Sequence, residues 1–163
     1  PMLVLALVTG LMALGRLFAG PIVEALNPVG VLLMSAIVTT IGIYLLSGAS
    51  GGMVYIAAMV FALGVTYFWP TMIGFISEYQ PKTGALGMSL LGGAGMFSMS
   101  IWNPVIGGWI DSAKVEAAAK GVAPEAIELA AGQATLQNLA LFPAVLIVIF
   151  AGLFFFRKKF ATK

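Results

Sequence analysis

Long apolar stretches follow one another along the chain, with little polar sequence between them. A helix needs about 20 mostly apolar residues to cross the hydrocarbon core of a bilayer, and five stretches of this kind occur. The pattern therefore predicts an all-α membrane protein with five transmembrane helices. The predicted spans are residues 3–26, 29–48, 53–78, 84–110 and 138–156.

The connections between the predicted spans are short, with one exception. Pro28 separates the first two spans, because proline cannot continue a helical hydrogen-bond ladder, and the glycine-rich run 48–52 separates the second from the third. Residues 111–137 form a long extracytoplasmic loop rich in alanine, glutamate and lysine. We expect this loop to form short helices outside the membrane, broken near Gly121 and Pro124.

Composition supports the membrane interpretation and excludes several classes of function. Hydrophobic residues make up 61% of the 163-residue chain and charged residues only 9%, against about 25% charged residues in a typical soluble domain. The chain has no cysteine and no histidine, which excludes disulfides, zinc sites built from these ligands, and Ser-His or Cys-His catalytic pairs. We therefore expect no enzyme activity, no cofactor and no metal site.

Basic residues predict the orientation of the chain, since those in short loops favour the cytoplasmic side. Five fall on one side of the predicted topology and two on the other. We expect a multi-pass protein of the plasma (inner) membrane with a cytoplasmic C-terminus. The net charge of +2 and the scatter of the basic residues indicate no nucleic-acid partner. The five are Lys82, Arg157, Lys158, Lys159 and Lys163, and the two are Lys114 and Lys120.

The first predicted span carries a charge deep in the membrane. Arg16 lies nine residues before Ala25, about 14 Å along a helix and close to the centre of a core about 30 Å thick. Glu24 shares its helical face but lies about 12 Å away along the axis, so Arg16 needs a partner from another helix. Arg16 either belongs to a polar pathway or caps the carbonyls of another helix as a packing contact.

The third predicted span has a polar face and an internal proline. Tyr67, Thr71 and Glu78 recur at helical spacing, and Pro70 follows Trp69. A proline inside a membrane helix frees a carbonyl that a neighbour or water must satisfy, and broken helices often border binding sites in transporters. The alternatives are a site wall that includes Trp69, or a plain kink with Trp69 packed among aromatic residues or facing lipid.

The remaining spans carry no charge within the membrane. The second has only small polar side chains and Tyr44 besides its apolar residues, so we expect a lipid-facing support helix. The fourth has a stripe of small and polar residues at helical spacing, which serves either close packing alone or packing by a helix that also rearranges. Trp102, Asn103 and Pro104 add an aromatic ring, an amide and a helix break. The packing positions are Gly93, Ser100 and Gly107.

The glycine and acidic positions of the first predicted span match a known motif. In residues 15–24, GRLFAGPIVE, Gly20 lies four residues before Glu24. This segment resembles the signature loop of the major facilitator superfamily of secondary transporters, roughly G-x-x-x-D-R-x-G-R-R, with Gly20 and Glu24 in the places of the glycine and the acid. Ala25 and Pro28 stand where the signature has basic residues, so the loop resembles the degenerate copy found in the second half of such transporters. The tenth helix, its following loop and the eleventh helix are similar to residues 67–74, 81–85 and 92–108.

This resemblance implies that the five spans correspond to helices eight to twelve of a bacterial twelve-helix transporter, as a partial C-terminal six-helix bundle. It implies a secondary transporter, loosely similar to sugar transporters or symporters, that moves a small polar solute such as a sugar or nucleoside by alternating access. A proton or a sodium ion would be the coupling ion. The chain begins with Pro1, and we expect a fragment whose partners are the bilayer, the solute, helix seven and the N-terminal half.

The alternative to a transporter is a complete five-span structural or assembly subunit of a membrane complex. The two hypotheses give different roles to the same residues. In that alternative, the small-residue stripe is an oligomer interface and residues 111–137 are a docking element. The residues expected along the substrate pathway are Arg16, Tyr67, Trp69, Thr71, Trp102 and Asn103. The residues expected at the cytoplasmic gate and loop are Gly20, Glu24, Glu78 and Lys82.

Overall fold

The computed structural model describes residues 2–79 and 81–160, and within them it describes all side chains except those of residues 23, 24, 78, 79 and 157–160. This part of the chain is all-helical and contains no strand, as expected. The helices are α1 (Met2–Leu17), α2 (Ala19–Leu26), α3 (Pro28–Gly48), α4 (Met53–Thr66), α5 (Phe68–Tyr79), the 3-10 turn η1 (Pro81–Thr83), α6 (Gly84–Ala119), α7 (Pro124–Leu139) and α8 (Leu141–Phe160).

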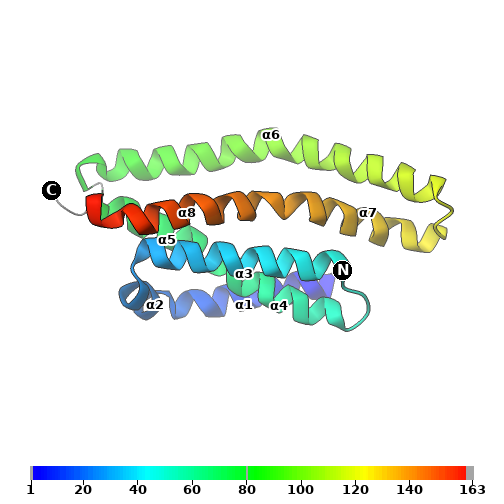
Figure 1. Ribbon diagram of the computed structural model, residues 1–163, viewed down its shortest axis with the longest axis horizontal. Coiled ribbons are helices and arrows are strands. Elements are labelled where there is room, and N and C mark those ends of the chain that lie inside the picture. Colours follow the sequence, from blue (N-terminus) through cyan, green and yellow to red (C-terminus); the bar gives the residue numbers. More distant parts are fainter. Residues whose placement is uncertain (1, 80, 161–163) are drawn as a thin grey trace.

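The helices lie side by side along the long axis of the molecule (Figure 1). α1, α2 and α4 form one edge, α3 and α5 lie next to them, α7 and α8 follow, and α6 forms the opposite edge. The α2–α3 and α5–α6 connections lie at the same end as the end of α8, and the α3–α4 and α6–α7 turns lie at the other end. Successive long helical segments therefore alternate in direction, as in a chain that crosses a layer repeatedly.

Several helices are compatible with a membrane protein by length and composition. Four stretches of the described chain are long and apolar enough to cross a bilayer, and Met2–Leu17 is apolar but shorter. The first predicted span is divided, since α1 ends at Leu17 and α2 begins at Ala19. The four long stretches are Pro28–Gly48, Met53–Ser77, Pro81–Ala119 and Pro124–Phe156.

Residues 111–137 are helical almost throughout. α6 continues without interruption to Ala119, because alanine, lysine and glutamate favour helix. The turn at Gly121, with φ of 74°, precedes Pro124 at the first position of α7, which matches the expected break. α7 and α8 then follow end to end (Figure 1). At 36 residues, α6 is about 54 Å long and exceeds a hydrocarbon core of about 30 Å, so its charged end extends beyond any such core.

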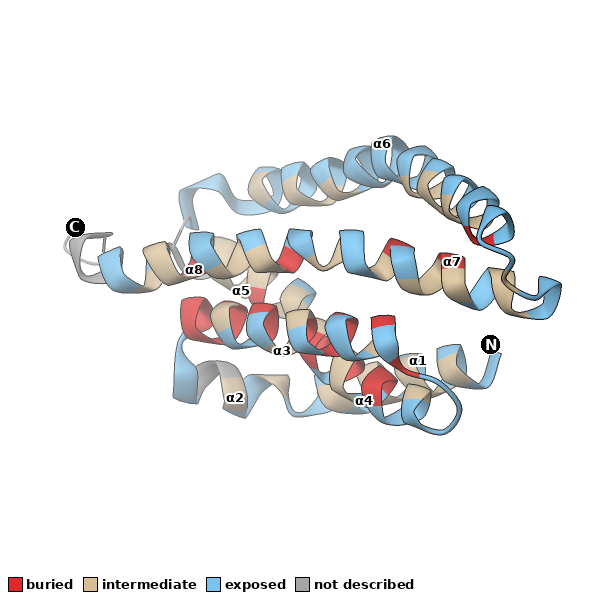
Figure 2. Ribbon diagram, turned by 45° about the vertical axis from the view of Figure 1, so that its right-hand side comes forward, coloured by how far each residue is buried: buried red, intermediate tan, exposed pale blue. Residues whose placement is uncertain are grey.

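Pro104 lies inside α6 without ending it, so the expected helix break at this position is wrong. Membrane-type helices tolerate an internal proline where the loss of one hydrogen bond is absorbed by a small adjustment of the backbone. α6 is instead curved along its length (Figure 2). A single bent helix therefore runs from the α5 end of the molecule to the α7 turn.

α3 is the central helix of the bundle, so the expectation of a lipid-facing support helix is wrong. It packs against α2, α4, α5, α7 and α8, and most of the buried residues in Figure 2 lie on it and α4. Small residues explain this position, because they allow backbones to approach where lipid gives no hydrophobic force. A Cβ atom on Gly42 would lie 2.5 Å from Phe61 Cα, and one on Gly64 would lie 2.5 Å from the Thr39 backbone nitrogen.

Candidate functional site

The helix that starts at Met53 breaks near the middle of the bundle. α4 ends at Thr66, and α5 begins at Phe68 with Pro70 as its third residue. Proline has no N–H to donate to the carbonyl four residues earlier and its ring collides with that group, and here that carbonyl belongs to Thr66. The backbone N–H of Thr71 bonds to the Tyr67 carbonyl at 3.1 Å. The expected interruption is therefore present, one turn before Pro70.

A second break divides α1 from α2 at Phe18, whose backbone N–H bonds to the Gly15 carbonyl at 3.1 Å. Pro21 is the third residue of α2 and lies four residues after Leu17, the last residue of α1. The local cause is the same as at Pro70. The sequence contains this signal, although the continuous apolar pattern of residues 3–26 obscures it.

The two breaks are in contact. A Cβ atom on Gly15 would lie 2.8 Å from Thr66 Cγ2 and 3.6 Å from the Tyr67 hydroxyl oxygen, so the last turn of α1 lies against the last turn of α4. Two residues earlier, Gly64 touches Thr39, the twelfth of the 21 residues of α3. Both breaks therefore lie within about one helical turn of the centre of the bundle.

Arg16 follows Gly15 and lies in the last turn of α1, where its side chain is exposed. A cation there interacts favourably with the helix dipole and with the free carbonyls of the helix end. Among the described side chains, none forms an ion pair or hydrogen bond with Arg16. The side chain of Glu24 lies outside the described residues. The guanidinium therefore faces the surface at the depth of both breaks.

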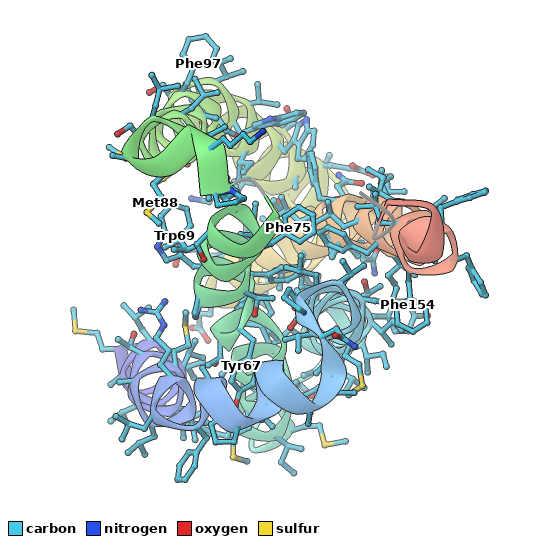
Figure 3. The ribbon with its side chains drawn as sticks, turned by 90° about the vertical axis from the view of Figure 1, so that its left-hand side faces the viewer. Tyr67, Trp69, Phe75, Met88, Phe97 and Phe154 are labelled. Atoms are coloured by element: carbon cyan, nitrogen blue, oxygen red, sulfur yellow. The ribbon has the colours of Figure 1, made fainter. Side chains whose placement is uncertain are left out.

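Two aromatic side chains at the α4–α5 break lie toward two different neighbours. The Tyr67 hydroxyl lies toward Gly15 of α1, whereas the Trp69 ring lies 3.9 Å from where a Cβ on Gly95 of α6 would be. Figure 3 shows Trp69 beside Met88 of α6. Thr71 is 1% exposed, and its hydroxyl oxygen has no hydrogen-bond partner among the described residues. The structure thus places Arg16, Tyr67 and Trp69 at about one level, but Tyr67 lies toward α1 and Trp69 toward α6, so the three do not form one cluster.

Trp102 and Asn103 lie apart from this group. Both follow Gly95 by seven or eight residues on α6, about 11 Å along the helix axis. Trp102 stacks edge-on against Phe142 of α8, with ring centroids 4.7 Å apart, and it lines a separate cavity between the helices. Asn103 is exposed. The six residues expected along a substrate pathway therefore do not form one cluster.

The residues expected at the gate are placed at the end of the molecule that holds the end of α8. Gly20 lies in α2 with no atom within 4 Å of where a Cβ would be, and Lys82 is exposed in η1. Glu24 lies on α2 and Glu78 on α5, and their side chains are outside the described residues. No group of three or more acidic side chains lies together in the described part of the chain.

The expected packing positions on α6 face open space. Gly93 and Gly107 have no atom within 4 Å of where a Cβ would be. Ser100 is exposed and donates a hydrogen bond to the Met96 carbonyl at 3.1 Å. Their role in helix packing stays a prediction, since the close approaches between helices are found at other glycines, namely Gly15, Gly42 and Gly64.

Six charged residues lie in the α6–α7 hairpin, namely Asp111, Lys114, Glu116, Lys120, Glu125 and Glu128. Lys120 donates a hydrogen bond to Glu116 at 2.6 Å, and Lys114 lies 3.9 Å from Glu128. The Lys120 ammonium, through this hydrogen bond and its charge, holds the pKa of the Glu116 carboxyl below its usual value.

Comparison of the chain with protein-family models, with curated proteins and with solved structures returned no match.

Proposed function

We propose that the chain is part of a secondary active transporter of the major facilitator type, which moves a small polar solute by alternating access. The observation that supports this proposal is the contact between two proline-broken helices at mid-depth, beside Arg16. Helix ends inside a membrane carry free backbone N–H and C=O groups, and transporters use discontinuous helices of this kind to hold solutes and ions near the midplane.

The side chains near the two helix breaks suit a polar solute that has a flat face for stacking on an aromatic ring. The Arg16 guanidinium would pair with an anionic group of the solute or with a carboxylate from a further helix. The Tyr67 hydroxyl would accept or donate a hydrogen bond, and the exposed Trp69 ring offers a stacking surface of the kind that sugars and nucleosides use. The face is open in this chain, so helix seven and the N-terminal half would close it.

The proposal places the protein in the plasma (inner) membrane with its C-terminus in the cytoplasm. The turn η1, which holds Lys82, and the end of α8, which holds Arg157, Lys158 and Lys159, lie at one end of the molecule, and basic residues next to spans favour the cytoplasmic side. A proton or a sodium ion would be the coupling ion. The solute gradient or the ion gradient would then drive the conformational change that opens the site near Arg16 to each side of the membrane in turn.

Uptake by reconstituted protein tests the proposal. The protein that contains this chain would be placed in liposomes and offered radiolabelled sugars and nucleosides under a pH or sodium gradient. We expect gradient-dependent uptake of at least one solute, and a loss of at least tenfold on Arg16→Lys, because lysine cannot reproduce the planar, bidentate guanidinium. Lys120→Arg, in the hairpin, is the matched control and should transport normally. Absence of uptake in every condition would contradict transport, and normal uptake by R16K would contradict the role of Arg16.

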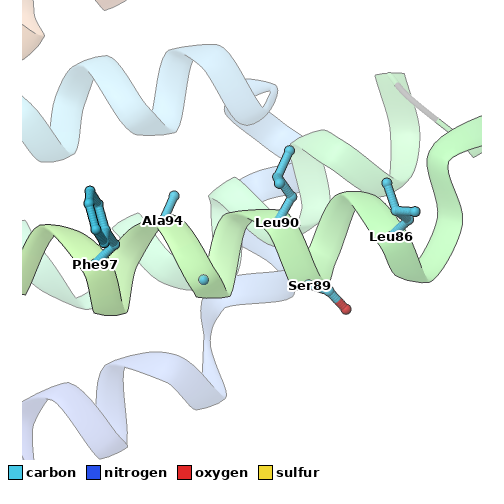
Figure 4. A pocket seen from close by; sticks show the side chains of 6 residues that line it. Leu86, Ser89, Leu90, Ala94 and Phe97 are labelled. Atoms are coloured by element: carbon cyan, nitrogen blue, oxygen red, sulfur yellow. The ribbon is translucent and has the colours of Figure 1, made fainter.

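A second candidate function is a structural or assembly subunit, and the outer face of α6 favours it. Between residues 84 and 110, α6 has no buried residue. Leu86, Leu90, Ala94 and Phe97 project from one side of it (Figure 4) and, with Ser89 and Gly93, line a shallow groove. Under this hypothesis, Ala94→Phe would abolish cross-linking to a partner in native membranes, while Arg16→Lys would have no effect on assembly.

A further inference from the structure

A cavity of about 400 Å³ lies between α3, α4, α5, α6 and the joined helices α7 and α8. Its polar side chains are Thr39, Ser98 and Trp102, and the other nine lining residues are apolar. The Thr39 hydroxyl oxygen lies 2.5 Å from where a Cβ on Gly64 would be, so it is directed toward α4. The space is open at its side rather than fully enclosed. Six of the apolar lining residues are Phe61, Val65, Phe68, Ile106, Leu139 and Leu146.

The lining residues extend along the helix axes. On α6 they run from Ser98 to Ile106, which corresponds to about 12 Å. Trp102 and Phe142, whose ring centroids are 4.7 Å apart, are in contact within this length. The cavity is therefore elongated along the bundle. It lies at the level of Thr39, the centre of α3, and so at the depth where a bilayer consists of hydrocarbon tails.

We propose that this cavity binds one acyl chain of a membrane lipid. A headgroup, a sugar or water at this depth would leave polar groups without hydrogen bonds, which is costly in apolar surroundings. An empty cavity would lose the dispersion contacts of its lining on every side. A hydrocarbon tail adds no polar group, restores the contacts of the apolar lining and matches the elongated shape. The Thr39 hydroxyl, which has no hydrogen-bond partner among the described residues, is directed toward α4. The proposal requires that the chain lies in a bilayer and does not depend on transport.

The bound chain would have a structural role for α6. Between residues 84 and 110, α6 contributes no buried residue, and it packs mainly along α7, with smaller contacts to α5 and η1 at its beginning. An acyl chain beside Ser98 and Ile106 would fill the space between the middle of α6 and the central helices. We expect the lipid to hold α6 against the bundle where its own side chains do not.

Photolabelling tests this proposal. The protein would be reconstituted in phosphatidylcholine vesicles that contain a phosphatidylcholine with a diazirine at the middle of one acyl chain, and labelled positions would be mapped by peptide mass spectrometry. We expect labelling of the lining residues on α6 and α8 that persists after detergent extraction of bulk lipid. Ser98→Phe should fill the cavity and lower this labelling at least fivefold.

Ser89→Phe is the matched control. Ser89 is nine residues from Ser98 and therefore on the opposite face of α6, where it lines the outer groove, so S89F should leave cavity labelling unchanged. Ile106→Phe fills the same cavity from another turn and replaces S98F if that variant does not fold. Equal labelling of cavity and outer face in the extracted protein, labelling unaffected by both filling variants, or protein–protein cross-links through the lining residues would each overturn the proposal.

Discussion

Pro21 and Pro70 have the same position relative to the helix break before each of them. Each is the third residue of its helix and the fourth after the last residue of the preceding helix, which is Leu17 for Pro21 and Thr66 for Pro70. Each ring removes the same backbone hydrogen bond. Because α1 packs against α4, the two helix breaks caused by these prolines lie side by side at the same depth in the bundle.

The break before Pro70 should close when proline is replaced. In Pro70→Ala, the amide of the substituted position could donate to the Thr66 carbonyl, and α4 and α5 would join as one helix. An interior proline costs a helix about 3 kcal/mol relative to alanine, so we expect stability to be unchanged or higher and the new amide at position 70 to be strongly protected from exchange. Hydrogen exchange with mass spectrometry measures this. Pro124→Ala, at the first position of α7 where proline is tolerated, is the control with no expected change.

If transport depends on the break, P70A should also lose uptake while it folds normally. Rapid exchange at position 70 in P70A would instead mean that the break is imposed by the packing of α1 and α3 around it, independently of the proline ring.

The α3–α4 interface should not tolerate a side chain at Gly64. A Cβ at this position would lie 2.5 Å from backbone and side-chain atoms of Thr39, and overpacking of this kind typically costs about 1–3 kcal/mol. We expect Gly64→Ala to lower the free energy of unfolding in mixed micelles by this amount. Gly93→Ala has open space around it and should be neutral or slightly stabilising, since alanine favours helix by about 1 kcal/mol over glycine. Equal stability of the two variants would contradict the close approach.

The α3–α4 turn is tied to α7 by one hydrogen bond. Gln133 Nε2 donates to the Ala49 carbonyl at 2.9 Å, and Ala49 is buried. Gln133→Ala should cost about 1 kcal/mol and should speed amide exchange in residues 49–52. Gln137→Ala, one turn further at an exposed position, should change neither quantity. A turn that stays equally protected in Q133A would show that apolar contacts alone hold it.

Acid should lower the stability of the α6–α7 hairpin slightly, through protonation of Glu116. Its pKa is lowered in the folded state by the Lys120 hydrogen bond and charge, so the stabilisation it gives is present above the unfolded value of 4.5 and is lost as the pH falls through the lower folded value. Both side chains are exposed, so the effect on stability is small. NMR titration of the Glu116 carboxyl should show a pKa below 4.5 that returns toward it in Lys120→Met. An unchanged pKa in that variant would exclude the ion pair.

Hydrophobic spacing predicts most helix positions and their alternating direction, because both follow from local sequence. It misses the division of the first span, since the apolar pattern continues across Phe18 and only Pro21 marks the break. It also ends the fourth span at Ile110, whereas helix propensity continues α6 to Ala119. The central position of α3 was missed because small polar residues such as Thr39 fit either a lipid-facing helix or a close helix contact.

The sequence does not predict which of the candidate site residues lie near one another. Arg16 and Tyr67 come together because Gly15 allows α1 to approach Thr66, whereas Trp69 lies toward α6 at Gly95. These are contacts between segments far apart in the chain, and periodicity within each helix does not encode them. Periodicity places Arg16, Tyr67 and Thr71 on polar faces of their helices, but it does not decide which way Trp69 faces, and it could not separate these residues from Trp102 and Asn103.

Because α6 is long and unbroken, a small tilt at one of its ends produces a large displacement at the other. A helix of 36 residues is a rod of about 54 Å, so a tilt of about 5° about one end displaces the other by about 5 Å. Its end near Lys114 is joined to α7 and, through Gln133, to the turn after α3. Any rearrangement beside Trp69 that tilts α6 therefore also moves the hairpin, where a pair of fluorescent labels could record the change far from Trp69.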